Sequence, residues 1–154
     1  MSLIDARLKE LGVTLSPLPK PAASFVPYTI SGNLVFISGQ VPVADGALKY
    51  LGKLGVDFSV EVGQAAAQLC AINILSVLKV ACEGDLDRVV QCLKVTVFCN
   101  ATPDYDKQPE VANGASDLFV AVFGDAGKHA RAAVGMGSLP RGVAVEVDAI
   151  FEIK

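Results

Sequence analysis

The sequence has few of the residues on which common site chemistries depend. It contains no tryptophan, a single histidine (His129) and four cysteines, none of them in a CxxC pair. Transition-metal sites are normally built from several His and Cys ligands, so we expect no metal site. We expect no cofactor of any other kind. Apolar helix and strand patterns surround the cysteines, which predicts reduced, buried thiols; they are Cys70, Cys82, Cys92 and Cys99.

Charge is also scarce. Charged residues make up 19% of the chain, the net charge is −3, and Lys and Arg form no cluster of five or more. Because nucleic-acid-binding proteins normally present a positive face, we expect no nucleic-acid partner.

We predict no membrane-spanning stretch. The longest uncharged run inside the apolar helix predicted over 59–83, residues 62–78, is short and interrupted by polar residues, whereas a span needs about 20 apolar residues. The N-terminus lacks the basic start and continuous apolar stretch of a signal peptide. We therefore expect a cytoplasmic protein that has no membrane partner.

Apolar residues, in contrast, are abundant. They make up 52% of the 154 residues, with a mean hydropathy of +0.48. The length predicts one domain over residues 1–154, in which residues 1–23 form an N-terminal helix and a Pro-rich connector. The apolar excess indicates either an unusually full core or burial against another subunit.

The period of the apolar residues changes along the chain and predicts the elements. We expect helices over 2–12, 59–83 and 111–123, and strands over 24–30, 33–38, 89–99, 131–136 and 143–153. A loop should occupy 100–109, and the last two strands should form a hairpin around the turn 138–142. Strands grouped around crossover helices predict an α+β fold with helices on one face of the sheet.

Arg131 stands at the head of a strand made of small apolar residues. Counting by twos, it shares a strand face with Ala133, Gly135 and Gly137, which leave room for a ligand. A guanidinium offers a planar pair of donors that fits a carboxylate. The pattern predicts a small carboxylate-bearing metabolite as ligand, although Arg131 alone could equally be a surface strand arginine.

Two further residues are ambiguous when considered alone. Glu146 on a strand is usually a solvated or edge carboxylate. His129 lies in a Gly-flanked loop, and a catalytic triad would depend on this one histidine, so a catalytic role is the weaker interpretation.

Together, several motifs resemble the Rid family, the reactive intermediate deaminases also known as YjgF-like proteins or endoribonuclease L-PSP. The resemblance covers about residues 24–154 and is carried by NLVFISGQVP, the long Ala-rich helix, VVQCLKVTVFCN and HARAAVGMGSLPRGVAVEVDAI. It implies a chorismate-mutase-like mixed sheet with two main helices packed on one face. It also implies a homotrimer whose ligand sites lie in clefts between subunits.

The resemblance assigns roles to individual residues. It implies that Arg131 and Glu146 are catalytic, with Arg131 binding a substrate carboxylate and Glu146 associated with a water molecule. The other substrate-binding positions that it implies are Ser38, Tyr28, Asn113 and Ala133. Because Ala133 stands where the well-studied deaminases have cysteine, the chain resembles a divergent subgroup.

Three functions are compatible with this pattern. The first is hydrolysis of reactive enamines and imines, such as 2-aminoacrylate, to 2-oxo acids and ammonia at the inter-subunit clefts. The second is non-catalytic binding of 2-oxo acids by a trimer that uses the same arginine. The third is a ribonuclease or translation inhibitor, which the net charge and the lack of a basic, aromatic-interleaved patch argue against.

Overall fold

A computed structural model describes residues 1–18 and 23–154. The helices are α1 (Leu3–Glu10), α2 (Val60–Ala81) and α3 (Gln108–Phe123). The strands are β1 (Tyr28–Ser31), β2 (Leu34–Gln40), β3 (Val43–Ala44), β4 (Ala47–Leu48), β5 (Val89–Asn100), β6 (Ala130–Met136) and β7 (Val145–Ile153). Short 3-10 turns are η1 (Leu86–Arg88), η2 (Gly124–Gly127) and η3 (Pro140–Gly142).

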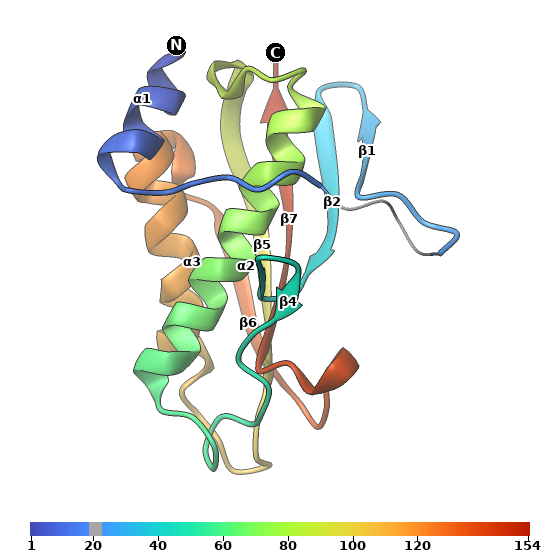
Figure 1. Ribbon diagram of the computed structural model, residues 1–154, viewed down its shortest axis with the longest axis vertical. Coiled ribbons are helices and arrows are strands. Elements are labelled where there is room, and N and C mark those ends of the chain that lie inside the picture. Colours follow the sequence, from blue (N-terminus) through green and yellow to red (C-terminus); the bar gives the residue numbers. More distant parts are fainter. Residues whose placement is uncertain (19–22) are drawn as a thin grey trace.

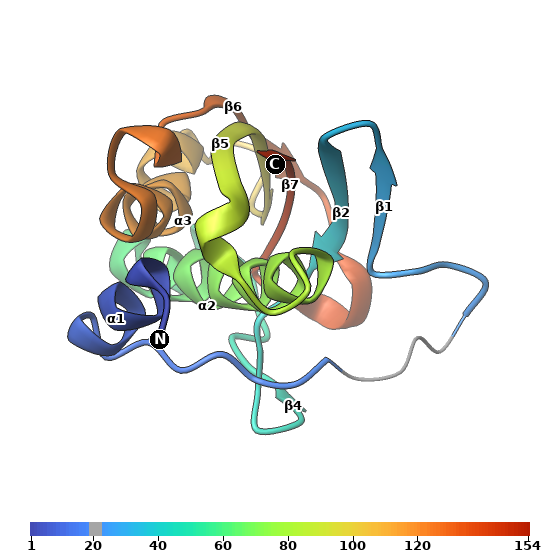
Figure 2. The same cartoon turned by 90° about the horizontal axis from the view of Figure 1, so that it is seen from above.

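Five strands form one mixed sheet in the order β1-β2-β7-β5-β6. All neighbours are antiparallel except β5 and β6, which run parallel. The helices α2 and α3 lie on one side of this sheet, and the described residues place no helix on the other side (Figures 1 and 2). The α+β architecture with two main helices on one face is therefore confirmed.

The core lies between the sheet and these two helices. Along β7 the odd-numbered residues from Val145 to Ile153 are buried and the even-numbered ones are half-buried, as the alternation of a strand with one covered face requires. Phe151 packs edge-on against Phe119 of α3, with ring centroids 5.6 Å apart. Burial of a side chain of this size stabilises the fold by about 1.5–3 kcal/mol.

The helix α2 is the most apolar element. Its N-cap Ser59 accepts a hydrogen bond from the backbone N–H of Val62, and Glu61 and Lys79 complement the dipole at its two ends. It is long and apolar enough to cross a membrane by length and composition alone, but 56% of its most apolar window is buried inside the fold. Figure 1 shows this helix lying along the sheet, where it forms part of the core.

Most predicted elements are found within a few residues of their expected bounds. The N-terminal helix is capped by Ser2, whose side chain accepts from the N–H of Asp5, as the motif predicts. The Asp5 carboxylate, however, pairs with Lys79 at 2.8 Å rather than closing a capping box. In the Pro-rich connector, Pro19 and Pro21 lie outside the described residues.

The predicted C-terminal hairpin is wrong. β6 pairs in parallel with β5, and β7 pairs with β5 and β2, so β5 lies between the two strands that were expected to be neighbours. The connection through η3 is long enough to pass the end of β5. At that end the backbone N–H of Asn100 donates to the carbonyl oxygen of Ala144 at 2.8 Å, and the N–H of Ala101 donates to the carbonyl oxygen of Met136 at 3.1 Å.

Close packing of α2 on α3 generates a stability prediction. Gly114 lies inside α3, where alanine would ordinarily stabilise a helix by about 1 kcal/mol. Here an added Cβ would lie 2.1 Å from the backbone oxygen of Gln64 on α2, so the helices would have to separate. We expect Gly114→Ala to lower the free energy of unfolding by about 1–3 kcal/mol, measured by urea denaturation.

The matched control is Gly137→Ala, because an added Cβ there meets nothing within 4 Å. It should change the free energy of unfolding by less than about 0.5 kcal/mol. A Gly114→Ala variant as stable as the wild type would contradict the close approach of α2 and α3.

Burial of the thiols generates a second prediction. All four cysteines are buried and free, and burial raises the pKa of both Cys92 and Cys99 to about 12. Because the thiolate is the reactive form, the native protein should react very slowly with a thiol reagent at pH 8. The unfolded, unreduced chain should release four equivalents. Two equivalents would indicate a disulfide and contradict the prediction.

Candidate functional site

The side chain of Arg131 is held between β6 and α3. Its Nη1 donates to the Oδ1 of Asn113 at 2.8 Å and to the Oγ of Ser116 at 3.2 Å. Both acceptors lie on α3 three residues apart, a spacing that puts two side chains on one face of a helix. Arg131 also pairs in register with the buried Val95 of β5, so its side chain is on the helix-covered side of the sheet.

These contacts leave part of the guanidinium available. The two hydrogens on Nη1 match its two acceptors, and among the described residues Nη2 and Nε have no hydrogen-bond partner. The Nε–Nη2 edge is therefore the one that can receive a carboxylate through two parallel hydrogen bonds. Along the same strand face, Ala133 is half-buried and Gly135 is exposed, so little bulk surrounds this edge.

A third group joins Arg131 through Ser116. The Nε2 of His129 lies 2.8 Å from the Oγ of Ser116, and its Nδ1 lies 2.7 Å from the carbonyl oxygen of Gly127. Burial lowers the pKa of His129, a trend that the Gly127 hydrogen bond opposes and the Arg131 charge reinforces. Sequence reasoning missed Ser116 altogether, and only the spacing of three residues after Asn113 could have pointed to it.

Glu146 lies elsewhere, on β7. Its neighbours Val145 and Val147 face the helices, so the alternation directs Glu146 to the opposite side of the sheet. Its carboxyl group approaches Gly39 of β2, where an added Cβ would lie 3.1 Å from the carboxyl carbon. Burial raises the pKa of Glu146, and the neighbouring Asp148 carboxylate raises it further.

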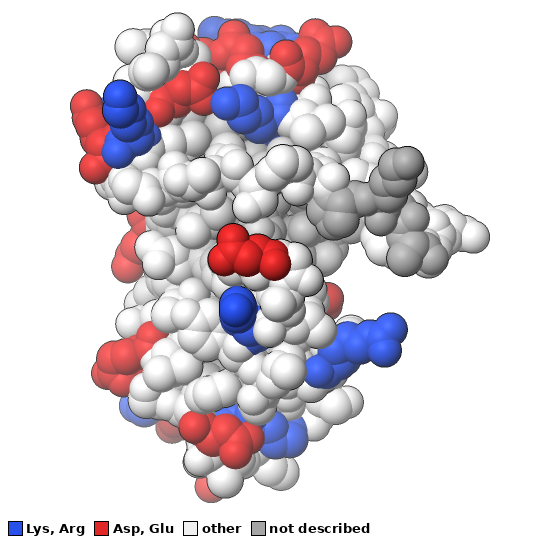
Figure 3. Space-filling model, viewed as in Figure 1, with Lys and Arg blue, Asp and Glu red and all other residues white. Residues whose placement is uncertain are grey.

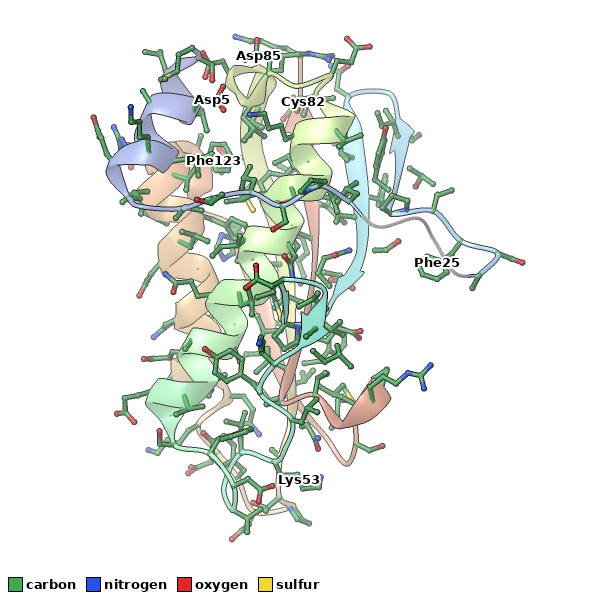
Figure 4. All side chains as sticks on the ribbon, in the orientation of Figure 1. Asp5, Phe25, Lys53, Cys82, Asp85 and Phe123 are labelled. Atoms are coloured by element: carbon green, nitrogen blue, oxygen red, sulfur yellow. The ribbon has the colours of Figure 1, made fainter. Side chains whose placement is uncertain are left out.

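Ser38 lies next to Gly39, at a register shift between β2 and β7. Its Oγ donates to the carbonyl oxygen of Val26 at 2.7 Å and its N–H donates to the carbonyl of Pro27 at 2.9 Å. Ser38 thereby holds the segment before β1 against β2. Figure 4 shows Phe25, which is 58% exposed, projecting from that segment.

Tyr28 lies near neither Arg131 nor Glu146. It pairs in register with Ile37, whose side chain is buried under the helices, so Tyr28 faces the helix-covered side of the edge strand β1. Arg131 lies on β6, the opposite edge of the sheet, and Glu146 points to the other face.

The predicted residues thus form two separate groups in one chain. Arg131, Asn113 and Ala133 lie on the helix-covered side at the β6 edge, and Ser38 and Glu146 lie on the bare side. On β5, Arg131 is in register with Val95 and Glu146 with Phe98, three residues or about 10 Å further along. Head groups that point to opposite faces cannot hold one small ligand within a single chain.

The other cations do not build an alternative site. Lys53, labelled in Figure 4 at one end of the molecule, donates to the Oδ1 of the buried Asn100 at 2.8 Å and to backbone carbonyls. It therefore closes the end of the sheet. On the face shown in Figure 3, the Lys and Arg side chains of the described residues lie in small groups among Asp and Glu, without a continuous basic surface.

Comparison with known proteins identifies the group to which the chain belongs. A family model described as YjgF/chorismate mutase-like, with an endoribonuclease in its name, matches residues 5–148. The chain belongs to the YjgF family. The mixed sheet with two helices on one face is thus a chorismate-mutase-like fold, as the motifs around Arg131 and Glu146 predicted.

Similar proteins span nearly the whole of this YjgF-family chain. Protein TCP17 of Trypanosoma cruzi is 46% identical over 97% of the chain and 94% of its own length. The RutC family protein PH0854 of Pyrococcus horikoshii is 30% identical over 86% of the chain and 89% of its own length. The crystal structure of Atu1372 from Agrobacterium tumefaciens, a protein of unknown function, is 48% identical, with a TM-score of 0.91 and coverage of 99% and 94%.

Proposed function

We propose that the protein is a hydrolytic deaminase that converts reactive enamines and imines, such as 2-aminoacrylate, to 2-oxo acids and ammonia. The observation that carries this proposal is the free Nε–Nη2 edge of Arg131, held in place by Asn113 and Ser116. A substrate carboxylate fits this edge, and no metal or other cofactor is needed for the reaction. The reaction would take place in the cytoplasm.

The site requires more than one copy of the chain. Arg131 and Glu146 lie on opposite faces of one sheet, so a cleft that contains both needs Arg131 from one subunit and Glu146 from another. The bare face of the sheet supports such an assembly because it carries apolar side chains; they are Phe36, Phe98, Val134 and Ile150. Phe36 is 40% exposed in the single chain. A cyclic homotrimer would bury this surface and form equivalent clefts.

The chemistry in this cleft is addition of water followed by loss of ammonia. The enamine first tautomerises to the imine, gaining a proton at C3 from solvent and losing one from its nitrogen, and the C2 of the imine is electrophilic. Glu146 accepts a proton from water as the oxygen attacks C2, and passes that proton to the nitrogen. The new hydroxyl then gives its proton to the nitrogen, the C–N bond breaks, and the products are a 2-oxo acid and ammonia.

Glu146 suits this role because its surroundings raise its pKa. Burial and Asp148 raise its pKa, which makes the carboxylate a better proton acceptor than an exposed glutamate. Ser38, on the same side of the sheet, could contact the far end of the substrate.

Non-catalytic binding of 2-oxo acids is the second candidate. It needs the same Arg131 edge, and Ala133 favours it because the well-studied deaminases have cysteine at this position. Nucleic-acid cleavage, which the family name mentions, is less well supported, since the chain has a net charge of −3 and Arg131 is paired to helix side chains.

Two substitutions test the proposed pair of hydrogen bonds between Arg131 and a substrate carboxylate, which we call the Arg131 clamp. Arg131→Ala removes both carboxylate contacts and should weaken pyruvate binding by about 2–5 kcal/mol, measured by calorimetric titration. Arg131→Lys should lie between Arg131→Ala and the wild type, because an ammonium keeps the charge but not the two-pronged geometry.

The oligomeric state of each protein is the control measurement for this experiment. Light scattering should give about three times the 16.0 kDa chain mass for all three proteins. Equal affinity in all three would rule out the clamp, and loss of the trimer in the variants would show that Arg131 is a structural residue at a subunit edge.

The role of Glu146 predicts a different pattern. Glu146→Gln should lower kcat for ammonia release from freshly generated 2-aminoacrylate by about 10²–10⁴, with pyruvate affinity kept. In the wild type, activity should fall as pH drops through the Glu146 pKa, at a higher pH than for an ordinary glutamate, because the protonated acid cannot accept the proton.

The matched control is Glu152→Gln, six residues further along the helix-free face of β7. It should keep both kcat and the pH profile. An unchanged kcat in Glu146→Gln would remove Glu146 from the reaction and favour the non-catalytic candidate.

A further inference from the structure

The Ser116–His129 pair lies behind Arg131 and has no part in the reaction described above. Ser116 Oγ is 3.2 Å from the Nη1 of Arg131 and 2.8 Å from the Nε2 of His129, so it bridges these two side chains. The Gly127 carbonyl, 2.7 Å from Nδ1, fixes the imidazole on its other side. Phe119 packs edge-on against the ring, with centroids 6.0 Å apart.

The proton positions in this series of hydrogen bonds follow from which atoms can donate and which can only accept. A carbonyl oxygen can only accept, so the Nδ1 of His129 carries a proton and donates to Gly127. In the neutral ring Nε2 is then an acceptor, and the Ser116 hydroxyl donates to it. The lone pairs of Ser116 remain free to accept from Nη1 of Arg131, so every hydrogen bond has one donor and one acceptor.

We propose that Ser116 and His129 are positioning residues that hold the Arg131 guanidinium and couple anion binding at its free edge to protonation of His129. The inference rests on the proposed function, since it concerns the same Arg131 edge. A protonated His129 donates from Nε2 to Ser116, which then accepts from both cations.

The coupling has a definite sign. Without a ligand, the Arg131 charge and burial both disfavour the imidazolium. A carboxylate on Arg131 offsets that charge and should raise the His129 pKa, so by linkage carboxylates bind more tightly as pH falls through the His129 pKa. Each unit of that rise corresponds to tenfold in affinity.

The charged groups around His129 are few. On β6 it faces Arg131, and on α3 it faces the uncharged Ser116 and Phe119. On η2 and the residue after it, Asp125 and Lys128 form an exposed ion pair of 3.2 Å. Lys94 of the neighbouring strand β5 faces the other side of the sheet, where its charge opposes the rise that burial causes in the pKa of Asp148. Arg131 therefore dominates the electrostatics of the ring.

The first arm of the test needs no ligand. His129 is the only histidine in the chain, so nitrogen-15 NMR of the intact protein reports a single imidazole. We expect its proton on Nδ1 at neutral pH and a higher His129 pKa in Arg131→Gln than in the wild type. Ser116→Ala should leave the proton on Nδ1, where the Gly127 carbonyl holds it, but should shift the Nε2 resonance, and Ser116→Thr, which keeps the hydroxyl, should restore that resonance.

The second arm measures pyruvate affinity between pH 5 and pH 8 by calorimetry, with Glu146→Gln as the background so that this carboxylate does not titrate. Affinity should rise about tenfold toward low pH, for a rise of about one unit in the His129 pKa on binding. His129→Gln and Ser116→Ala should flatten the profile. Ser76→Ala is the matched control, because Ser76 is a helix serine bonded only to its own helix at Ile72, and it should keep the profile.

The outcomes separate the two proposals. A flat wild-type profile with Arg131-dependent binding, or a proton on Nε2 at neutral pH, would overturn the coupling and leave the deaminase intact. A steep, His129-dependent profile without ammonia release would support the coupling and overturn the deaminase. If pyruvate bound to no variant, both would be wrong.

Discussion

The alternation of side chains along a β-strand is the constraint on which the functional account depends. Val145 and Val147 must face α2 and α3 to fill the core, so Glu146 between them must face the other way. Arg131 is directed by the same rule toward α3, where Asn113 and Ser116 receive it. The packing that stabilises the fold therefore separates the two groups proposed for catalysis, which is why the proposed site is one shared between copies.

On the helix-covered side of the sheet, the packing of α3 positions the Arg131 side chain. Gly114, next to Asn113, lets α3 approach the backbone of α2 closely, and this fixes the face that α3 presents to β6. Asn113 and Ser116 then occupy both hydrogens of Nη1 and leave one edge of the guanidinium for a carboxylate. On the bare side, Gly39 leaves room for the Glu146 carboxyl group in the same way.

Local patterns predicted most of the fold, and non-local contacts account for what they missed. The helices expected over 2–12 and 59–83 and the strand expected over 143–153 rest on local signals, and the structure contains each of them, with Ser2 and Ser59 as the helix caps. The parallel pairing of β5 with β6 joins strands separated by a helix, whereas the turn at 138–142 suggested a hairpin. Arg131 and Glu146 were found by resemblance, but only the register shows that they face apart, and Ser116 carries no sequence signal of its own.

A subunit-mixing experiment tests most directly whether each site is shared between copies. Arg131→Ala and Glu146→Gln chains, each inactive alone, are co-expressed with different tags, and mixed trimers are isolated and assayed for ammonia release from 2-aminoacrylate. In every mixed trimer one of the three interfaces pairs an intact Arg131 from one chain with an intact Glu146 from the other, so about a third of the wild-type rate should return. Mixed trimers that stay inactive, while mixed wild-type trimers with the same tags are active, would contradict a site built from Arg131 and Glu146 of different subunits.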